Sequence, residues 1–321
     1  MFCSAQVQDK TSAFIKMFQF PPFLKPSDLT GIIPPASKIP KIFINQAKTI
    51  IESWGLKVIL SKNWDKDHFG FAGTDKERLQ AFQELLDNKE IKCIFCARGG
   101  YGTSRIIDQL DLNGFISSPK WIIGYSDITV LLNKLLIHQY SGIHGPMPIN
   151  FIEDNSEESL QILKKFLFYG TYPELRIPTN KQNRPGFASG ELVGGNLTML
   201  TNSIGTSTQL NTDGRILFIE DIDERMYRVD RMLVHMKRAG MFKKLKGLVV
   251  GHFTDITERK EFGYSIEELI LSHTEKFDFP VCFGAPIGHI MPNYPIIVGA
   301  EVSLHVESNK ATLALKENPG N

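Results

Sequence analysis

The stretch Trp121-Ile122-Ile123-Gly124-Tyr125-Ser126-Asp127-Ile128-Thr129 indicates most directly how the chain folds. A short apolar run reaches Gly-Tyr-Ser, and isoleucine and leucine then recur at helical spacing through residues 128–136. We therefore predict a strand, a sharp turn at Ser126 and a helix. A serine on such a corner can present its hydroxyl beside helix N-terminal amides, as an acyl-transfer nucleophile requires. Serine is also a favoured helix N-cap, so a plain capping role for Ser126 stays open.

The same alternation of apolar and amphipathic segments occupies the first half of the chain. It predicts strands at residues 30–33, 56–60 and 91–97, and helices at 42–54, at 74–86 and from about Thr103. Strands that alternate with helices favour a mainly parallel sheet with helices on both faces, an α/β fold.

The pattern changes after the segment His144-Gly145-Pro146-Met147-Pro148. One more helix is predicted at 156–169, and the following residues are rich in proline, asparagine and polar side chains. Beyond them we predict a smaller β-rich domain with short strands and two helices, near 226–239 and 265–276. The expected organisation is a disordered tail at 1–20, an α/β nucleophile domain at 21–170, a linker at 171–189, and the β-rich domain at 190–321.

Composition excludes several classes of function. The chain has 321 residues, enough for two domains, and its 42% hydrophobic and 22% charged content is ordinary for a globular protein. A net charge of +1 offers no electrostatic basis for binding nucleic acid or acidic membranes. No run of about 18 apolar residues occurs, so no membrane-spanning segment is expected.

Cysteine usage indicates a reducing compartment. Cys93 and Cys96 lie three apart inside a predicted strand, where they point to opposite faces and chelate poorly. No second pair completes a zinc site, so we interpret them as buried thiols. The first 17 residues lack an apolar core and do not form an intact signal peptide. Cys3 leaves open a clipped lipoprotein remnant or a misassigned start, with Met17 as an alternative initiator.

The loop Arg98-Gly99-Gly100-Tyr101-Gly102 follows a predicted strand. Glycines let a backbone approach a ligand closely, and amides at a helix start bind negative charge. An oxyanion hole built from the backbone amides of Gly100 and Asp127 fits this pattern. A phosphate site or a simple tight turn fits it as well, because the spacing matches neither common nucleotide-binding motif.

An acidic pair, Glu220-Asp221, stands at the end of the apolar segment 215–219. A carboxylate there can orient a histidine in a nucleophile–base–orienter arrangement. The alternative is a solvated acidic loop before a helix. No histidine at ligand spacing supports a metal, and none is expected.

Three of the eight histidines lie beside a glycine near a turn: His144, His252 and His289. His289 stands in a loop stiffened by proline and glycine, but spacing alone does not choose among the three. The other five are expected to pack or to lie on the surface: His68, His138, His235, His273 and His305.

Taken together, these segments resemble the LD-carboxypeptidase family of serine peptidases, which includes the muramoyltetrapeptide carboxypeptidases and their microcin-immunity relatives. The resemblance runs from about residue 22 to 315 and depends on an ordered set of motifs rather than on any one of them. Near the start of the chain, Pro26-Ser27-Asp28 stands where the family usually has Pro-Gly-Asp. The matching motifs are 24–28, 31–32, 98–102, 124–129, 144–147, 194–197, 220–221, 227, 230–231, 288–289 and 293.

The resemblance implies a Rossmann-like N-terminal domain, a smaller C-terminal domain, and a homodimer. It places the nucleophile at Ser126, the general base at His289 and the orienting carboxylate at Glu220. Arg98, Gly99 and Tyr101 become candidates for substrate binding. The implied reaction removes the terminal D-alanine from murein tetrapeptides during cytoplasmic wall recycling, without metal or organic cofactor. Because Ser126 lies in one domain and the other two residues in the second, interdomain geometry is expected to gate activity.

Two alternatives stay open. A microcin-immunity type of hydrolase would cleave peptidyl- or aminoacyl-nucleotide conjugates with the same residues. A non-catalytic nucleotide- or peptide-binding module would use the glycine loop as an anion cradle and would not need Ser126. The sequence does not decide which diamino acid is preferred or where a dimer interface lies.

Overall fold

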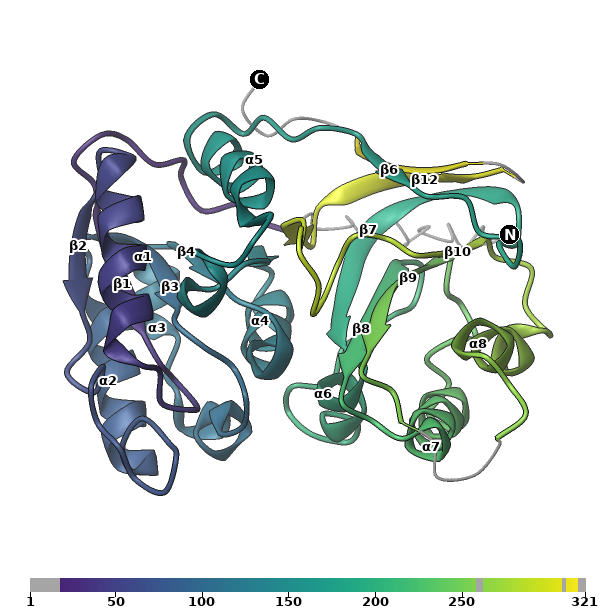
Figure 1. Ribbon diagram of the computed structural model, residues 1–321, viewed down its shortest axis with the longest axis horizontal. Helices are drawn as coiled ribbons and strands as arrows, with labels where there is room; N and C mark the ends of the chain where they lie inside the picture. The colour runs from purple at the N-terminus through teal and green to yellow at the C-terminus, as the bar shows by residue number, and fades with distance from the viewer. Residues whose placement is uncertain (1–17, 258–261, 308–309, 317–321) are drawn as a thin grey trace, which may run out of the picture.

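The computed structural model describes residues 18–257, 262–307 and 310–316, and most of the expected tail lies outside them. Figure 1 shows two lobes side by side, the first coloured purple to teal and the second from the teal of β6 and β7 through green to yellow. Each lobe is built on one sheet, six-stranded in the first lobe and seven-stranded in the second. Within the described residues, no helix has both the length and the apolar character needed to cross a bilayer.

The first sheet has the strand order β11-β5-β4-β3-β1-β2. Its first five strands in sequence are parallel, and only β11 runs antiparallel, against β5. The mainly parallel sheet predicted from the alternation of strands and helices is therefore confirmed. The strands are β1 (Leu29–Ile33), β2 (Lys57–Leu60), β3 (Ile91–Cys96), β4 (Trp121–Ile123), β5 (Gly142–His144) and β11 (Ile296–Val298).

Helices cover both faces of this sheet, and a separate hydrophobic core lies under each face. Apolar side chains of α1 and α5 join one core, and those of α2, α3 and α4 join the other. Along β3, Cys93 contributes to the first core and Cys96 to the second, as the alternation of side chains in a strand requires. The helices are α1 (Lys41–Ser53), α2 (Asp75–Asp87), α3 (Asn113–Ser117), α4 (Thr129–Ile137) and α5 (Ser156–Tyr169).

The helix expected from about Thr103 is wrong. Two short 3₁₀ turns, η1 (Thr103–Arg105) and η2 (Ile107–Gln109), stand there instead. At the end of this segment the ammonium group of Lys134 donates to the carbonyls of Ile107 (2.6 Å) and Leu110 (2.8 Å). The Ile107 carbonyl also accepts from the amide of Leu110 (3.4 Å), which is the i→i+3 bond of a 3₁₀ turn.

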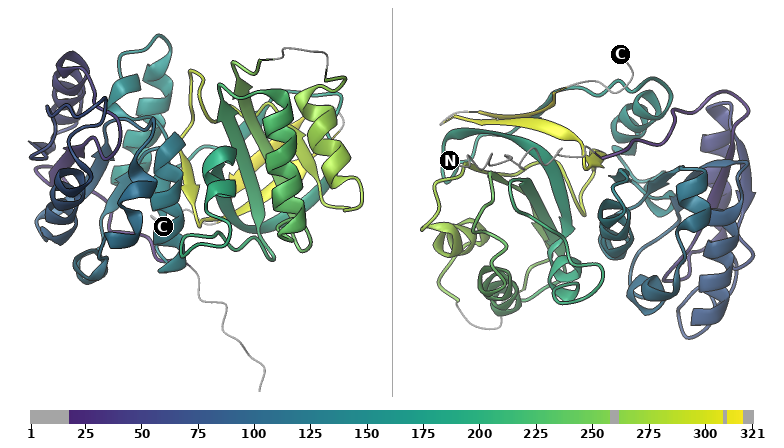
Figure 2. Two further views of the ribbon diagram at one scale, coloured as in Figure 1. Left: turned by 90° about the horizontal axis from the view of Figure 1, so that it is seen from below. Right: turned by 180° about the vertical axis from the view of Figure 1, so that it is seen from behind.

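The second sheet has the order β10-β9-β8-β7-β12-β13-β6. The strands from β7 to β10 are parallel and the others are antiparallel, with β7 joining the two halves. Figure 2 shows α7 and α8 side by side over the parallel half. The strands are β6 (Leu175–Ile177), β7 (Gly186–Asn196), β8 (Ile216–Ile222), β9 (Gly247–Thr254), β10 (Val281–Phe283), β12 (Glu301–Val306) and β13 (Ala311–Leu315). The helices are α6 (Leu197–Asn202), α7 (Met226–Arg238) and α8 (Ile266–Thr274).

The structure corrects the expected boundary between the domains. The segment 171–189 is not a plain linker, because it contains β6 and the first residues of β7. Strand β11 lies in the chain region expected to form the second domain, yet it completes the first sheet. Residues 18–20 are also ordered, with Phe18 only 5% exposed and Gln19 bridged to Tyr140. Strands β6 and β11 have three residues each, which is too short for periodicity to indicate a strand.

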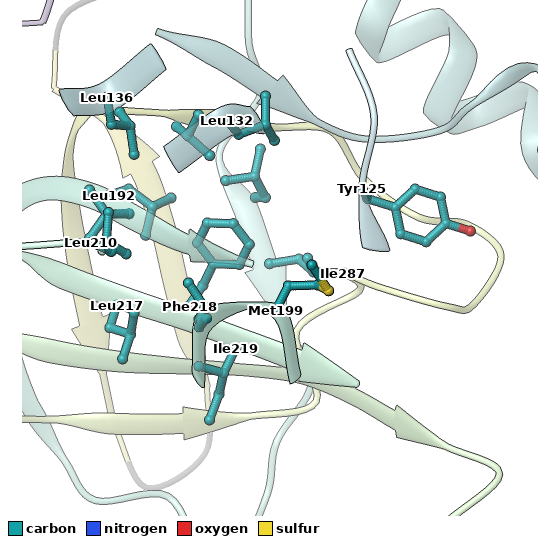
Figure 3. Close-up of a cluster of buried hydrophobic side chains, with 14 of the residues drawn as sticks. Tyr125, Leu132, Leu136, Leu192, Met199, Leu210, Leu217, Phe218, Ile219 and Ile287 are labelled. Atoms are coloured by element: carbon teal, nitrogen blue, oxygen red, sulfur yellow. The ribbon is translucent and has the colours of Figure 1, made fainter. Parts of the chain in front are cut away.

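The two lobes meet along α4. Leu132 and Leu136 of this helix pack in one continuous hydrophobic cluster with Leu192, Met199 and Phe218 of the second lobe, as Figure 3 shows. Nearly every residue of α4 is buried, as expected of a helix enclosed by protein on all sides.

At one end of this seam the backbone of β7 lies directly against the side chain of Thr129, the first residue of α4. A side chain at Gly195 would place its first carbon 2.6 Å from the hydroxyl oxygen of Thr129, and the φ of Gly195 is +148°. The next amide, of Asn196, donates to that same hydroxyl (3.1 Å). The first turn of α4, which follows Ser126, is thus fixed directly against the second lobe.

Replacing Gly195 with alanine should therefore separate the lobes locally. We expect Gly195→Ala to lower the free energy of unfolding by about 2–4 kcal/mol, from overpacking and an unfavourable φ. Urea unfolding measures this. Gly214→Ala is the matched control, because Gly214 also has a positive φ (+71°) but open space around it. Equal losses in the two variants would contradict a close contact at Gly195.

Candidate active site

Ser126 lies on the corner between β4 and α4, as predicted. Its φ is +62°, a left-handed conformation that is unfavourable for a residue other than glycine. Capping does not explain this serine, because the N-cap positions of η3 (Ser126–Ile128) and α4 are Tyr125 and Ile128. Among the described residues none forms a hydrogen bond with the Ser126 hydroxyl, and the residue is only partly buried. A strained serine between a strand and a helix matches the geometry of a nucleophile elbow.

The glycine loop after β3 lies directly against this corner. A first side-chain carbon at Gly99 would stand 3.3 Å from Ser126 Oγ and 3.2 Å from the backbone nitrogen of Asp127. One at Gly100, whose φ is +86°, would collide with Ser37. Glycine at position 100 therefore avoids a collision, and a side chain at position 99 would be in tight contact with the serine corner.

The side chains of Arg98 and Tyr101 in this loop are exposed and contact groups other than Ser126. Arg98 is exposed and donates from Nη1 to the carbonyl of Lys38 (3.0 Å). Tyr101 is 57% exposed and lies against the ring of Phe71, with ring centroids 5.9 Å apart. Their part in substrate binding stays a prediction.

Glu220 is the buried carboxylate of the site. It lies within β8 rather than beyond its end and is 0% exposed, so the interpretation as a solvated acidic loop is wrong. Its Oε2 is 2.7 Å from Nδ1 of His289. The register between β8 and β9 shifts between Ile219 and Asp221, and such a bulge re-aims a side chain.

Gly288 allows the loop between β10 and β11, which carries His289, to approach the carboxylate of Glu220. Gly288 has a φ of +108°, and a side chain there would come within 2.6 Å of Glu220 Oε2. The amide of Gly288 donates to Oδ1 of buried Asn293 (3.0 Å), which closes the loop. This loop leaves β10 in the second sheet and enters β11 in the first, so both lobes hold His289 in place.

The environment of His289 favours its charged form. Burial lowers the pKa of its imidazole, but the hydrogen bond and negative charge of Glu220, with a smaller contribution from Asp221, raise that pKa above its ordinary value. Asp221 is itself buried, and burial together with the charge of Glu220 raises its pKa to about 6. Hydrogen bonds from Asn196 (2.8 Å) and Thr198 (2.8 Å and 3.0 Å) hold Asp221 beneath the site.

The structure distinguishes the three histidines that spacing left open. His144 is fully buried between the rings of Tyr125 and Phe218, and burial lowers its pKa to about 4, so it is a neutral core residue. His252 is half-buried on β9, and burial lowers its pKa as well. Of the three, His289 is the one paired with a carboxylate.

Tyr125 brings the two halves of the site together. Its ring centroid is 4.8 Å from that of His289, and Tyr125 directly precedes Ser126. Among the described residues no hydrogen bond joins Ser126 to His289, although such bonds are often long before substrate binds. The arrangement places a strained serine, a carboxylate-paired imidazole and a glycine loop around one corner, which suits acyl transfer.

Within the described residues, no group of three histidine, cysteine, aspartate or glutamate side chains could hold a metal ion.

Sequence reasoning missed Ser37, which supports the glycine loop. Its amide donates to the carbonyl of Gly99 (3.2 Å), and its hydroxyl accepts from the amide of Tyr101 (3.4 Å). The only sequence signal is a small residue after two prolines at the end of the first strand, which is too common to be informative.

Two family sequence models match this chain. The LD-carboxypeptidase N-terminal domain matches residues 30–145, and the LD-carboxypeptidase C-terminal domain matches residues 189–304.

Individual relatives cover nearly the whole chain. A probable murein peptide carboxypeptidase of Bacillus subtilis is 36% identical, over 91% of this chain and 93% of its own length. The crystal structure of a muramoyltetrapeptide carboxypeptidase from Oxalobacter formigenes superposes with a TM-score of 0.81 at 32% identity, over 91% of this chain and 99% of its own. The microcin C7 self-immunity protein MccF of Escherichia coli is 27% identical over 81% of this chain and 84% of its own length.

A methyl group at Gly99 should hinder the approach of any electrophile to Ser126. We expect Gly99→Ala to slow covalent labelling of Ser126 by a fluorophosphonate by about 10-fold or more, because the methyl group stands against Oγ and the Asp127 amide. Labelling rates followed by intact-protein mass spectrometry measure this. Gly70→Ala, on a neighbouring loop with open space, is the control. An unchanged rate in Gly99→Ala would show that the loop does not border the reacting atom.

The carboxylate should control the titration of His289. We expect its imidazole to titrate above 6.5 in NMR spectra, and Glu220→Gln to lower that pKa, because burial then acts without a compensating charge. The His289 resonance is identified by its loss in His289→Gln. Because the folded pKa is raised, the linked stabilisation is present below the unfolded pKa and is lost as the pH rises through the folded pKa. An unshifted resonance in Glu220→Gln would argue against the pairing in solution.

Proposed function

The chain belongs to the LD-carboxypeptidase family, and on that premise we propose that this carboxypeptidase removes the terminal D-alanine from murein tetrapeptides by serine catalysis. The observation that carries the proposal is the buried hydrogen bond between Glu220 and His289 beside the strained corner of Ser126. These three residues lie far apart in the sequence, and they form the nucleophile, base and orienter of an acyl-transfer triad.

The first half of the reaction forms an acyl-enzyme. Nδ1 of His289 is engaged by Glu220, so the neutral ring with its proton on Nδ1 offers Nε2 as the base. Ser126 Oγ attacks the carbonyl carbon of the scissile peptide bond, and its proton passes to Nε2. Glu220 stabilises the imidazolium that forms. The backbone amides of Gly100 and Asp127 stabilise the oxyanion, which is often a large share of the rate gain.

The second half regenerates the serine. The bond between the carbonyl carbon and the D-alanine nitrogen breaks, and this nitrogen takes the proton from His289. A water molecule then gives a proton to His289 and attacks the ester, so the shortened peptide leaves and Ser126 regains its proton. The base must be neutral at the start, and therefore activity falls as the pH drops through the raised pKa of His289.

The biological setting follows the family resemblance. We place the reaction in cytoplasmic recycling of wall peptides, at the bond between the L-centre of the diamino acid and the terminal D-alanine, in a homodimer and without a cofactor. Three cysteines, Cys93, Cys96 and Cys282, are buried free thiols, which is consistent with a reducing compartment.

A second candidate activity is hydrolysis of aminoacyl- or peptidyl-nucleotide conjugates. The observation in its favour is the 27% identity to the microcin C7 self-immunity protein. The greater identity to the murein peptide carboxypeptidase of Bacillus subtilis favours the murein substrate. Comparing kcat/KM for a tetrapeptide and for an aminoacyl sulfamoyl adenosine separates the two.

Incubation with purified murein tetrapeptide tests the main proposal. We expect the enzyme to release one alanine, detected by mass spectrometry, and Ser126→Ala to reduce the rate by about 10³-fold or more, because the attacking hydroxyl is then absent. Ser53→Ala, an exposed serine of α1, is the matched control and should keep full activity.

Three outcomes would count against the proposal. An intact tetrapeptide together with a cleaved nucleotide conjugate would favour the second activity. Full activity in Ser126→Ala would exclude serine catalysis. Binding of either ligand without turnover, and without fluorophosphonate labelling, would indicate a non-catalytic module.

A further inference from the structure

Arg78 of α2 is a charged side chain that is 0% exposed, and the catalytic steps above do not use it. Arginine is almost never fully buried unless it is paired. Its Nη2 is paired with Asp75, and its Nη1 donates to the carbonyls of Pro35 (2.7 Å) and Gly102 (2.8 Å). Burial lowers the pKa of the guanidinium, and the negative charge of Asp75 opposes that shift.

The two carbonyls belong to different loops at the same edge of the first sheet. Pro35 follows β1 and stands two residues before Ser37, whereas Gly102 ends the glycine loop after β3. The contact is close, because a side chain at Gly102 would place its first carbon 2.8 Å from Nη1 of Arg78. The planar guanidinium therefore fixes the separation of the two loops.

Three other hydrogen bonds fix the same loop at neighbouring backbone groups. Ser37 accepts from the amide of Tyr101 and donates to the carbonyl of Gly99, and the amide of Thr103 donates to Oδ2 of Asp127 (2.8 Å). Together with the bond from Arg78 to Gly102, these ties hold the carbonyls of residues 99 and 102 and the amides of residues 101 and 103. None of the four uses the amide of Gly100.

We propose that Arg78 is a positioning residue for the reaction, and that its buried guanidinium holds the loop 98–102 where the Gly100 amide can stabilise the oxyanion at Ser126. This inference rests on the proposed role of Ser126. An oxyanion donor acts only when it stands about 3 Å from the developing charge, so a small displacement of the loop weakens it. Substrate binding in the ground state does not depend on that donor. Arg78 therefore contributes to stabilisation of the transition state and not to the affinity for the substrate.

The chain offers a matched control in Arg105. Like Arg78, it pairs with Asp75 (2.7 Å) and lies over the ring of Phe71. Its side chain is 46% exposed, and it bonds to Asp75 and interacts with the side chain of Tyr101, but it donates to neither of the two loop carbonyls that Arg78 holds. Arg105→Met therefore removes a bond to Asp75 without releasing Pro35 or Gly102.

The test compares Arg78→Met, Arg78→Lys and Arg105→Met with the unmodified enzyme, after thermal unfolding shows that each is folded at the assay temperature. In Arg78→Met we expect kcat to fall about 10- to 100-fold with KM within about twofold. A peptide boronic acid, which forms a tetrahedral adduct with Ser126, should lose affinity by a similar factor, whereas the tripeptide product should bind unchanged. Arg78→Lys should recover part of the loss, because one ammonium can reach one carbonyl. Arg105→Met should keep full activity.

Fluorophosphonate labelling of Ser126 gives a readout that does not depend on the substrate. An enzyme that labels but leaves the tetrapeptide intact would contradict the proposed substrate, and the labelling rates of Arg78→Met and Arg105→Met would still test this inference. Unchanged kcat and labelling in Arg78→Met would overturn it. Equal weakening of the boronic acid and the product would also overturn it, because Arg78 would then support the fold alone.

Discussion

The buried hydrogen bond between Glu220 and His289 is the interaction on which the site depends. A carboxylate with no exposed surface is costly unless it is paired, and its 2.7 Å contact with the imidazole supplies the pairing. Three features of the second lobe hold the carboxylate and the imidazole at hydrogen-bonding distance. The bulge in β8 aims the carboxylate, Gly288 leaves room for it, and Asn293 closes the loop that carries the histidine.

The packing between the two lobes limits how far their relative position can change, and the sequence had led us to expect that this position gates activity. A continuous hydrophobic cluster spans the seam, and Gly195 and Thr129 are in contact there. The loop of His289 is fixed at one end to each sheet. These contacts resemble the interior of one domain more than a transient domain interface. The distance from Ser126 to His289 is therefore set by packing, in the same way as the distances within either lobe.

The sequence predicted the elements with strong periodicity and the residues with distinctive motifs. The strand–turn–helix at Ser126, helix α5 and the parallel core strands follow from local pattern alone. Periodicity could not reveal β6, β11 or α6, because each has only three to six residues, and the two strands pair with segments far away in the sequence. Nor could spacing choose His289 over His144 and His252, since the difference is a carboxylate about 70 positions away along the chain. The two 3₁₀ turns after Thr103 were equally hidden from the sequence pattern.

The crossing of β11 into the first sheet has a consequence for synthesis on the ribosome. Strand β5 ends at His144, but the strand that covers its open edge begins only at Ile296. Through roughly half of translation the nascent first lobe presents an unpaired strand edge and lacks its last ladder of backbone hydrogen bonds. Such edges invite pairing with other chains, and long-range closure of this kind is slow. Although its helices and parallel strands are local, the N-terminal half cannot finish folding before nearly the whole polypeptide has emerged.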